Sequence, residues 1–471
     1  MKYVIFILTC LGTIPAAVWC ALSRRSFELM ATAMCLPALV YQNTAINPLS
    51  FEWYRGTARG YEISLIYLVA ITILMTLALR HKKISFFPDG GSKLYLLYFI
   101  WTCLSMQNAA SLICSGAEIL KMLMMLLVFA ATYSWLCAVK DPKPLLLGLA
   151  LVVTGTFFLV VRQHLGGIWQ VTGPFPHQNS LALYMLMAAP VFFSYYLNAD
   201  RGAKGSLLFA AAFFLGSGCL VRTYSRGAIA CYPIALFVVF ALSVFRKFKT
   251  RLFVRLLPLV LLGLLGLLLI LPRIIERFEN APKSSGDTRI EFARVALNMM
   301  KDQPLFGVGV NNWGIKVNPP YTYWVGTGRR MRGGEGLDDP TFLDGIVETV
   351  YLLVGAECGI PALIIMLVWY GYYLLSCWRL SKKLAGTSWF FLPVGLAGGL
   401  LGTFLQSTLE WVLKQSVNFS EMIIFFALVS FMNAHWRDLK GETAKGEAAP
   451  LPVSPRTRAH HLELPPVEHE R

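Results

Sequence analysis

The stretch GPFPHQNSLALYMLMAAPVFFSYYL, residues 173–197, joins a short polar patch to a predominantly apolar run that covers 180–197. A helix of this length is about long enough to cross the hydrocarbon core of a bilayer. Comparable runs recur from one end of the chain to the other, separated by polar segments. The pattern predicts an all-α polytopic membrane protein, and the polar patch marks the mouth of one of its helices.

Composition supports this class, because 56% of the 471 residues are hydrophobic and only 14% are charged, unlike the average soluble chain. We expect about 12–13 transmembrane helices. The second is short enough to be re-entrant instead of spanning. The predicted spans are 2–22, 27–41, 62–79, 94–113, 117–137, 144–162, 180–197, 205–221, 227–245, 254–272, 348–377, 390–409 and 418–435.

The formal net charge of +16 is compatible with a nucleic-acid partner, so the positions of the charges matter. Basic residues concentrate in every second loop, as in 80–83 and 379–383. This alternation is the positive-inside pattern of cytoplasmic loops. It predicts no nucleic-acid partner, and it places the 173–179 patch, the 273–345 segment and the 410–417 turn together on the opposite face.

Four regions of the chain differ in hydrophobicity and composition. We expect N-terminal transmembrane helices at 1–272, a large loop at 273–345, C-terminal transmembrane helices at 346–436 and a tail at 437–471. The tail has the composition of a disordered segment, and the charge pattern puts it in the cytoplasm. The ten cysteines lie in or beside apolar runs, so we expect neither a disulfide framework nor a metal motif.

The large loop contains a predicted amphipathic helix. Asp287 or Thr288 can cap it, and the pattern stops before Pro304. Such a helix lies on the membrane surface with its polar side toward water or a site. A Gly-rich turn at 307–309 follows, and the segment 316–345 is typical of a lid or an irregular binding loop. The predicted apolar face consists of Ile290, Ala293, Val295, Ala296, Leu297 and Met300.

Arginines on the side of the membrane opposite the basic loops are candidate anion ligands. Arg222 and Arg226 are four residues apart, so a continuous helix would give them one face; anchoring to lipid headgroups is the alternative. Arg289, in the first turn of the amphipathic helix, opposes the helix dipole and needs a partner. A diphosphate fits, because guanidinium donors match phosphate oxygens, whereas Glu291 is the simpler partner. Arg294, on another face, is a candidate acceptor contact.

The polar patch combines helix capping with candidate ligand contacts. Asn179 with Ser180 can cap the helix that follows, while His177 and Gln178 add donors and acceptors at the same mouth. We expect Gln178 and Asn179 to contact an acceptor. For His177 a ligand contact and a satisfied loop histidine remain open.

Glu348, at the start of a later span, is the first candidate for a general base, and His177 is the second. A carboxylate at that position is also what a helix N-terminus favours. Glu410 and Lys414 are four residues apart in TLEWVLKQ. We interpret them as an intrahelical pair, with a cavity-facing role as the alternative.

Over residues 60–435 the order of these motifs resembles the O-antigen ligase and polymerase superfamily of bacterial membrane glycosyltransferases. The resemblance implies a multi-pass protein of the bacterial inner membrane with its active site facing the periplasm. It implies inverting, metal-independent transfer of a glycan from an undecaprenyl-diphosphate carrier to a sugar acceptor such as lipid A-core, without a cofactor. The motifs are G-x-F-x-x-x-N at 173–179, S-R-G-A at 225–228, TRIEFARVALNMMKDQPLFGVGVNNW at 288–313 and YL-x-x-x-AE-x-G-I-P at 351–361.

By the same resemblance Arg226 and Arg289 bind the diphosphate, and we expect Arg222 to join them. The family commonly has a His-Asn pair where this chain has Glu348 and Thr349, so ligase, repeat-unit polymerase and protein O-glycosylating transferase stay open. A transporter or flippase for an anionic lipid-linked substrate is the rival class, although the chain shows no convincing internal repeat. A non-catalytic envelope scaffold is the third alternative.

Overall fold

The computed structural model describes residues 2–51, 54–198, 206–246, 283–327 and 345–448, with four isolated positions between 254 and 272. Within these ranges the chain is all-α, as predicted, and pairs extended backbone only in two isolated bridges. The helices are α1 (Lys2–Leu22), α2 (Arg24–Cys35), η1 (Leu36–Val40), α3 (Tyr41–Thr44), α4 (Leu65–Leu79), α5 (Gly90–Ser105), η2 (Met106–Asn108), α6 (Leu112–Val139), α7 (Lys143–Leu165), α8 (Gln178–Asn198), α9 (Ser206–Arg222), α10 (Arg226–Arg246), α12 (Lys283–Asp302), α13 (Trp313–Lys316), α14 (Val350–Lys383), α15 (Phe391–Gln406), η4 (Val412–Lys414) and α16 (Ser416–Ala448).

Among the described residues, six helices are long and apolar enough to cross a membrane: α6, α7, α8, α10, α14 and α16. Shorter apolar helices occur within α1, α4, α9 and α15. The chain is therefore a polytopic membrane protein. The predicted span 27–41 is not one helix, because it divides into α2, η1 and α3, with Pro37 near the first junction. The predicted span 254–272 lies outside the described ranges except at isolated positions.

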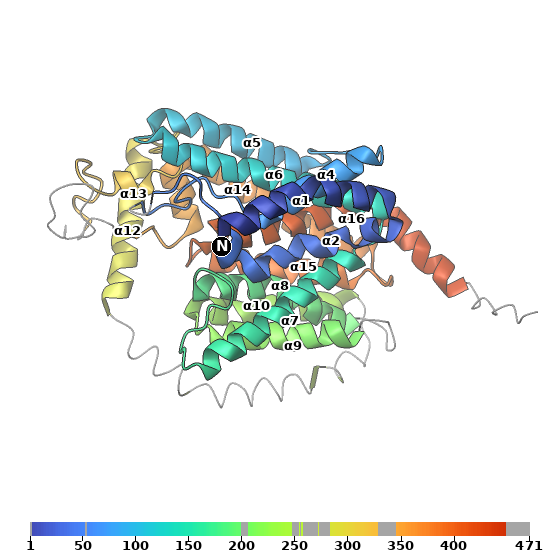
Figure 1. Ribbon diagram of the computed structural model, residues 1–471. Coiled ribbons are helices and arrows are strands. Elements are labelled where there is room, and N and C mark those ends of the chain that lie inside the picture. The colour runs from blue at the N-terminus through green and yellow to red at the C-terminus, as the bar shows by residue number, and fades with distance from the viewer. Residues whose placement is uncertain are drawn as a thin grey trace, which may run out of the picture.

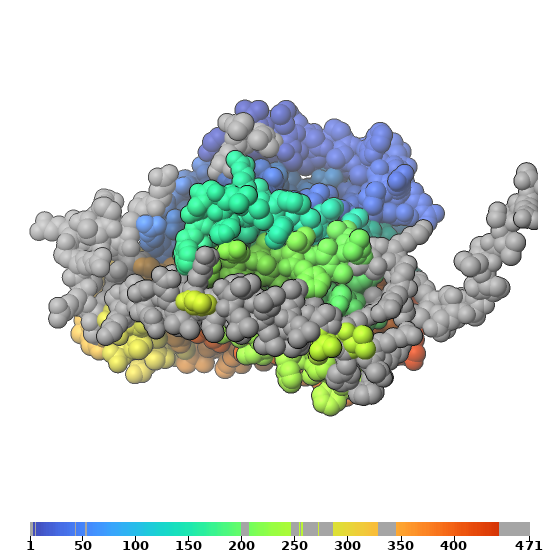
Figure 2. All heavy atoms as spheres, turned by 90° about the horizontal axis from the view of Figure 1, so that it is seen from below, coloured from blue at the N-terminus to red at the C-terminus, as the bar shows by residue number. Residues whose placement is uncertain are grey.

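Helices α8 and α16 lie inside the bundle (Figure 1). In their most apolar stretches 94% and 89% of the residues are buried, against 39% to 56% in the other four long helices. A span that faces lipid leaves one side exposed, so α8 and α16 are surrounded by protein. Figure 2 shows α7 between the N-terminal helices and the α9–α10 pair, and α7 packs against both α2 and α9.

Helix α12 crosses one end of the bundle instead of running parallel to the spans (Figure 1). It is amphipathic, but it begins at Lys283, earlier than the cap predicted at 287–288. The predicted apolar face was partly wrong, since Ile290 and Leu297 are 55% and 45% exposed. The stripe is rotated because Phe292 anchors it, at i, i+3, i+4 and i+7 spacing. The buried residues are Phe292, Val295, Ala296 and Met299.

Helix α14 is interrupted at Gly359, whose φ of 84° is non-helical. Because Pro361 has no N–H, the Glu357 carbonyl lacks its usual helical donor, and it accepts from the Gly309 amide at 3.0 Å. The preceding carbonyl, of Ala356, accepts from Val308 at 2.9 Å. The Gly-rich turn therefore supplies the donors that the broken helix lacks.

This docking requires close backbone approach. A Cβ added at Gly359 would lie 2.2 Å from the Leu305 carbonyl oxygen, and one at Gly307 would lie 2.4 Å from the Glu357 carbonyl carbon. Both glycines also have positive φ, which other residues rarely adopt. The motifs around GVG and ECGIP are thus two halves of one packing arrangement that holds α12 against α14.

The other end of the bundle carries basic residues from several predicted cytoplasmic loops. Lys140 Nζ lies 3.8 Å from Asp438 of α16, and Lys383 Nζ lies 4.9 Å from the centre of the Trp436 ring. In Figure 1 this end of α16 projects on the side opposite α12. Helix α16 continues to Ala448, past residue 437, where the sequence predicted the tail to begin.

Candidate functional site

The end of the bundle crossed by α12 collects polar side chains from five segments distant in the sequence. Asn179 lies in the first turn of α8, Arg226 begins α10, and Arg289 lies on α12. Glu348 precedes α14, and Glu410 lies in the turn between α15 and η4. We call these five residues the Arg289 cluster. They meet because the helices that carry or follow them have ends at this side of the bundle.

Arg289 lies between two carboxylates. Its Nε pairs with Glu348, and its Nη2 donates to Glu410 Oε1 at 3.4 Å. The side chains of Arg289 and Glu348 are 37% and 38% exposed, whereas that of Glu410 is 10% exposed. Since α12 begins at Lys283, Arg289 is in the second turn, not the predicted first. Its partners come from other elements, and a partly exposed guanidinium held this way can exchange a carboxylate for another anion.

Of the two acids that pair with Arg289, Glu410 is the more buried. Burial and the charge of Glu348 raise the pKa of Glu410 to about 7, against the opposing effects of Arg289, of a hydrogen bond from the Asn179 side chain, and of Arg226. A carboxyl that titrates near neutrality can accept a proton at physiological pH. Such perturbed groups in a polar cleft are candidates for acid–base chemistry.

The predicted intrahelical pair of Glu410 with Lys414 is wrong. Helix α15 ends at Gln406, and the chain between Glu410 and Lys414 passes from a turn into the short helix η4. Glu410 contacts Arg289, while Lys414 Nζ lies 3.1 Å from Glu118. Because the i, i+4 rule needs a continuous α-helix, the broken backbone sends the two side chains to different partners.

His177, not Asn179 or Ser180, caps α8. Its Nδ1 accepts a hydrogen bond from the Asn179 amide at 3.2 Å, and an N–H can only donate. In the neutral ring the proton therefore sits on Nε2, which makes His177 a donor rather than a base toward the site. Ser180 Oγ instead accepts from Asn418 at 2.9 Å, and Gln178 Nε2 donates to Gln170 at 3.4 Å.

Arg222 and Arg294 are the two other arginines that the sequence predicted as ligands. Arg222 ends α9 and Arg226 begins α10, with Tyr224 at a φ of 50° between them. They occupy two helices and do not share the predicted face. Arg294 donates to the Thr327 carbonyl at 3.1 Å. Within the described ranges, neither Arg222 nor Arg294 forms a hydrogen bond or ion pair with the cluster.

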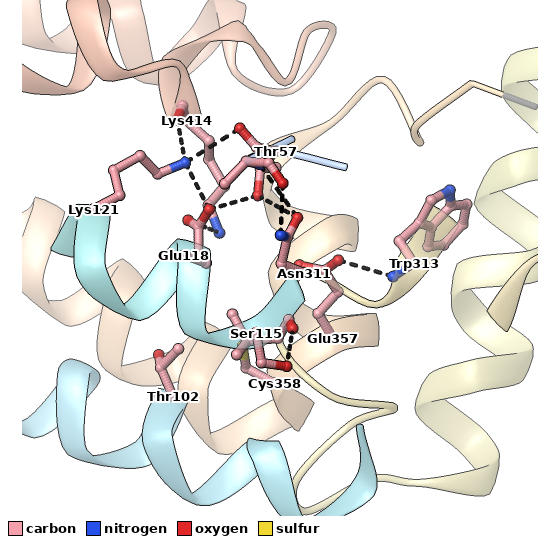
Figure 3. Close-up of polar contacts among 12 residues, drawn as sticks. Thr57, Thr102, Ser115, Glu118, Lys121, Asn311, Trp313, Glu357, Cys358 and Lys414 are labelled. Carbon is pink, nitrogen blue, oxygen red and sulfur yellow. Dashed lines mark hydrogen bonds and ion pairs between the residues drawn. The ribbon is translucent and has the colours of Figure 1, made fainter. Parts of the chain in front are cut away.

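A buried ion triad supports the turn that carries Glu410 (Figure 3). Glu118 Oε2 lies 2.6 Å from Lys121 Nζ, and Glu118 Oε1 lies 3.1 Å from Lys414 Nζ. The three side chains are at most 9% exposed. Lys121 Nζ also donates to the Lys414 carbonyl at 2.9 Å. Helix α6 thus holds both the side chain and the backbone of Lys414, four residues from Glu410.

The triad continues into the VNNW part of the large loop (Figure 3). Thr57 Oγ1 donates to Glu118 at 2.7 Å and lies 3.2 Å from Asn311 Oδ1. Glu357 Oε1 accepts from the Trp313 amide at 3.0 Å. Sequence reasoning assigned no role to this buried network. The sequence does carry a signal for this network, because Glu118 and the lysine three residues later are charged residues inside an apolar run.

These contacts place the Arg289 guanidinium beside an acid of near-neutral pKa, on which the charge of Arg226 also acts. The forked guanidinium donors of Arg226 and Arg289 match phosphate oxygens. Glu410 can accept a proton. Among the residues that the structure describes, no three His, Cys, Asp or Glu side chains converge as metal ligands. The arrangement is suited to binding an anion next to a hydroxyl that loses its proton.

Residues 211–367 match the profile of a protein family described as O-antigen ligase. The matched range includes Arg226, Arg289 and Glu348, and it contains α10, α12 and the first half of α14. Asn179 and Glu410 lie outside it. No curated protein matches the chain.

Proposed function

We propose that this chain, a multi-pass membrane protein of the O-antigen ligase and polymerase superfamily, transfers a glycan from an undecaprenyl-diphosphate carrier to a sugar hydroxyl. The family match over 211–367 supports the class of reaction. The observation that carries the assignment is the Arg289 cluster, in which Arg289 pairs with a buried acid, Glu410, and the charges of Arg289 and Arg226 both lower the pKa of that acid. The proposed side is the periplasm, opposite the basic end of the bundle.

Arg226 and Arg289 are the proposed diphosphate ligands. In the structure Glu348 and Glu410 compensate Arg289, and the diphosphate would replace part of this compensation. Fixed cations in a partly desolvated site stabilise the charge that develops on the departing diphosphate. Loss of one such preorganised donor costs about 2.7–4 kcal/mol in other enzymes. The polyprenyl tail would remain in the bilayer.

Glu410 is the proposed base, in place of the sequence-based candidates Glu348 and His177. It accepts the acceptor hydroxyl proton as the acceptor oxygen bonds to the anomeric carbon and the bond from that carbon to the diphosphate oxygen breaks. A single displacement of this kind inverts the anomeric centre. Because Arg289 lowers the pKa of Glu410, engagement of Arg289 by the diphosphate would make Glu410 a stronger base. Glu348 then holds Arg289 in position.

The proposed acceptor is lipid A-core, which makes the protein a ligase. Repeat-unit polymerization is the second candidate, because Glu348 and Thr349 stand where ligases commonly have a His-Asn pair. The product ladder of a deletion strain separates the two. Loss of a ligase leaves full-length glycan on the lipid carrier, whereas loss of a polymerase leaves single repeat units.

The test uses membrane vesicles that contain the full chain and a lipid-linked donor. Arg226→Ala and Arg289→Ala should each lower the rate of transfer by roughly 100-fold or more, the effect of removing one transition-state donor. Lys301→Ala, an exposed lysine on the same helix as Arg289, is the matched control and should leave the rate unchanged. Equal transfer by all four proteins would overturn the mechanism. Movement of donor without a new glycosidic bond, seen by product mass, would favour a transporter.

A further inference from the structure

A cleft of about 460 Å³ lies between α12 and the segment that follows α13. Its volume is within the range of about 300–1,000 Å³ that is usual for small-molecule sites. The cleft belongs to the large loop and shares no lining residue with the Arg289 cluster. Its lining consists of Asn298 and Asp302 of α12 and of Pro320, Tyr321, Thr322 and Tyr323.

The two tyrosine rings of the cleft are held by contacts with neighbouring residues. Tyr323 Oη donates to Asp302 Oδ2 at 2.6 Å, and the Tyr323 carbonyl accepts from Asn298 Nδ2 at 2.9 Å. Lys316 Nζ lies 4.2 Å from the centre of the Tyr321 ring, within cation–π distance. Rings ordered before a ligand arrives lose less entropy on binding, so the cleft is preorganised.

Hydrogen-bond acceptors remain available beside these rings. Asp302 uses Oδ2 for its contacts, and Asn298 uses its amide N–H. Among the described residues, Asp302 Oδ1 and Asn298 Oδ1 have no hydrogen-bond partner. A carboxylate and an amide oxygen accept hydrogen bonds from hydroxyl groups. Thr322, which is exposed, adds a hydroxyl that can donate or accept.

This chemistry selects among ligand classes. Among the described residues, neither a Lys nor an Arg lines the cleft, and Asp302 repels anions, so a phosphate is a poor ligand. The polar rim is equally unsuited to a lipid tail. A sugar ring has apolar C–H faces and a border of hydroxyl donors, which match tyrosine rings beside carboxylate and amide acceptors. We propose that this cleft is a saccharide subsite that holds a sugar of the donor glycan away from the reacting bond.

The position of the cleft fits this use, and the inference rests on the proposed function for the direction of the glycan. Asn298 and Asp302 follow Arg289 by nine and thirteen residues on the same helix. At 1.5 Å rise per residue the separations are about 14 Å and 20 Å along the helix axis. A glycan whose diphosphate lies at Arg289 can therefore extend along α12 and reach the cleft with a later sugar.

The first test is binding, with the full chain in lipid nanodiscs. The probes come from the surface glycan of the bacterium that encodes this chain, freed from lipid by mild acid. One probe is a single repeat unit, and the other is a fragment of several units. Tyr321→Ala should weaken binding of the longer fragment roughly tenfold, as expected for loss of an aromatic anchor at a binding surface. Tyr321→Phe, which keeps the ring, should retain binding, and Lys301→Ala, beside the cleft but not lining it, should match wild type.

The second test separates failure of the subsite from failure of the proposed function. With a donor that carries several repeat units, Tyr321→Ala should raise KM roughly tenfold and leave kcat unchanged, while with a single-unit donor both constants stay at wild-type values. The subsite is overturned when wild type binds no free glycan, or when Tyr321→Ala and wild type respond equally to donor length. A wild type that binds glycan but forms no product overturns the proposed function and leaves the subsite standing.

Discussion

Glu348 and Glu410 both contact Arg289, yet their surroundings give them different chemistry. Glu348 is 38% exposed and pairs with the guanidinium. Glu410 is 10% exposed, and burial is the main cause of its raised pKa. An efficient base at neutral pH has a pKa near the working pH. Burial, rather than closeness to Arg289, distinguishes the proposed base from the proposed positioning residue.

The pH dependence of transfer tests this distinction. At donor concentrations below KM, where the rate reports the free enzyme, wild-type transfer should rise with pH through about pH 7 and then level off, because Glu410, with a pKa of about 7, must be deprotonated to act as a base. Glu410→Gln should lower the rate by roughly 100-fold or more. Glu348→Gln should move the rising limb to lower pH, because the charge of Glu348 raises the pKa of Glu410. Initial rates across about pH 5.5–9 measure both effects.

The opposite pattern would assign the base to Glu348. In that case Glu348→Gln abolishes transfer, whereas the transfer rate of Glu410→Gln still rises with pH. Amounts of folded protein, measured by size-exclusion chromatography in detergent, control for variants that fail to fold.

The buried triad predicts an order of stability among its variants. Glu118→Gln should destabilise the protein by roughly 3–5 kcal/mol, because it removes the carboxylate that pairs with both buried lysines, Lys121 and Lys414. Lys414→Met should cost less, since the pair of Glu118 with Lys121 at 2.6 Å remains. Glu118→Gln combined with Lys414→Met should be more stable than Glu118→Gln alone. Thermal unfolding in detergent measures the order, and strictly additive effects would contradict the charge argument.

At the scale of elements, the decisive contact is between the Gly-rich turn and the break in α14. The break frees two carbonyls, and the turn supplies the amides that reach them. This exchange holds the C-terminal end of α12 in place and so determines where Arg289 lies. A helix break beside a site is thus explained here by backbone hydrogen bonding.

Replacing Gly359 by alanine should disrupt this contact. The new Cβ would lie 2.2 Å from the Leu305 carbonyl oxygen, at a φ of 84° that alanine rarely adopts, and we expect a loss of roughly 3 kcal/mol. Gly371, in the same helix, has nothing within 4 Å of an added Cβ. Gly371→Ala should therefore leave stability unchanged or raise it by up to about 1 kcal/mol. Equal thermal unfolding midpoints for the two variants would refute the packing argument.

At the scale of the whole molecule, α12 with the Arg289 cluster lies at one end of the bundle, and the basic residues around Lys140 and Lys383 lie at the other. The proposed mechanism depends on several helices that each bring a side chain to the same end of the bundle. Positive loops favour the cytoplasm. The charge distribution therefore supports a periplasmic site.

Thiol labelling in intact cells checks this orientation. In a background without the native cysteines, Lys301→Cys on α12 should react with a membrane-impermeant maleimide, because the residue is exposed at the site end. Lys382→Cys, exposed at the end of α14, should react only after the inner membrane is broken. Labelling of both positions from the same side would exclude the proposed topology.

The sequence alone was sufficient for the all-α membrane class and for the amphipathic helix in the large loop, and it proposed Arg226 and Arg289 as ligands. These features follow from hydrophobic runs, helical spacing and motifs, which are properties of neighbouring residues. Only the tertiary structure showed the burial of Glu410, the contact of Arg294 with the Thr327 carbonyl and the bond network from Glu118 to Lys414. Burial and ion pairing depend on groups that lie far away in the chain, and only the packed helices bring those groups together.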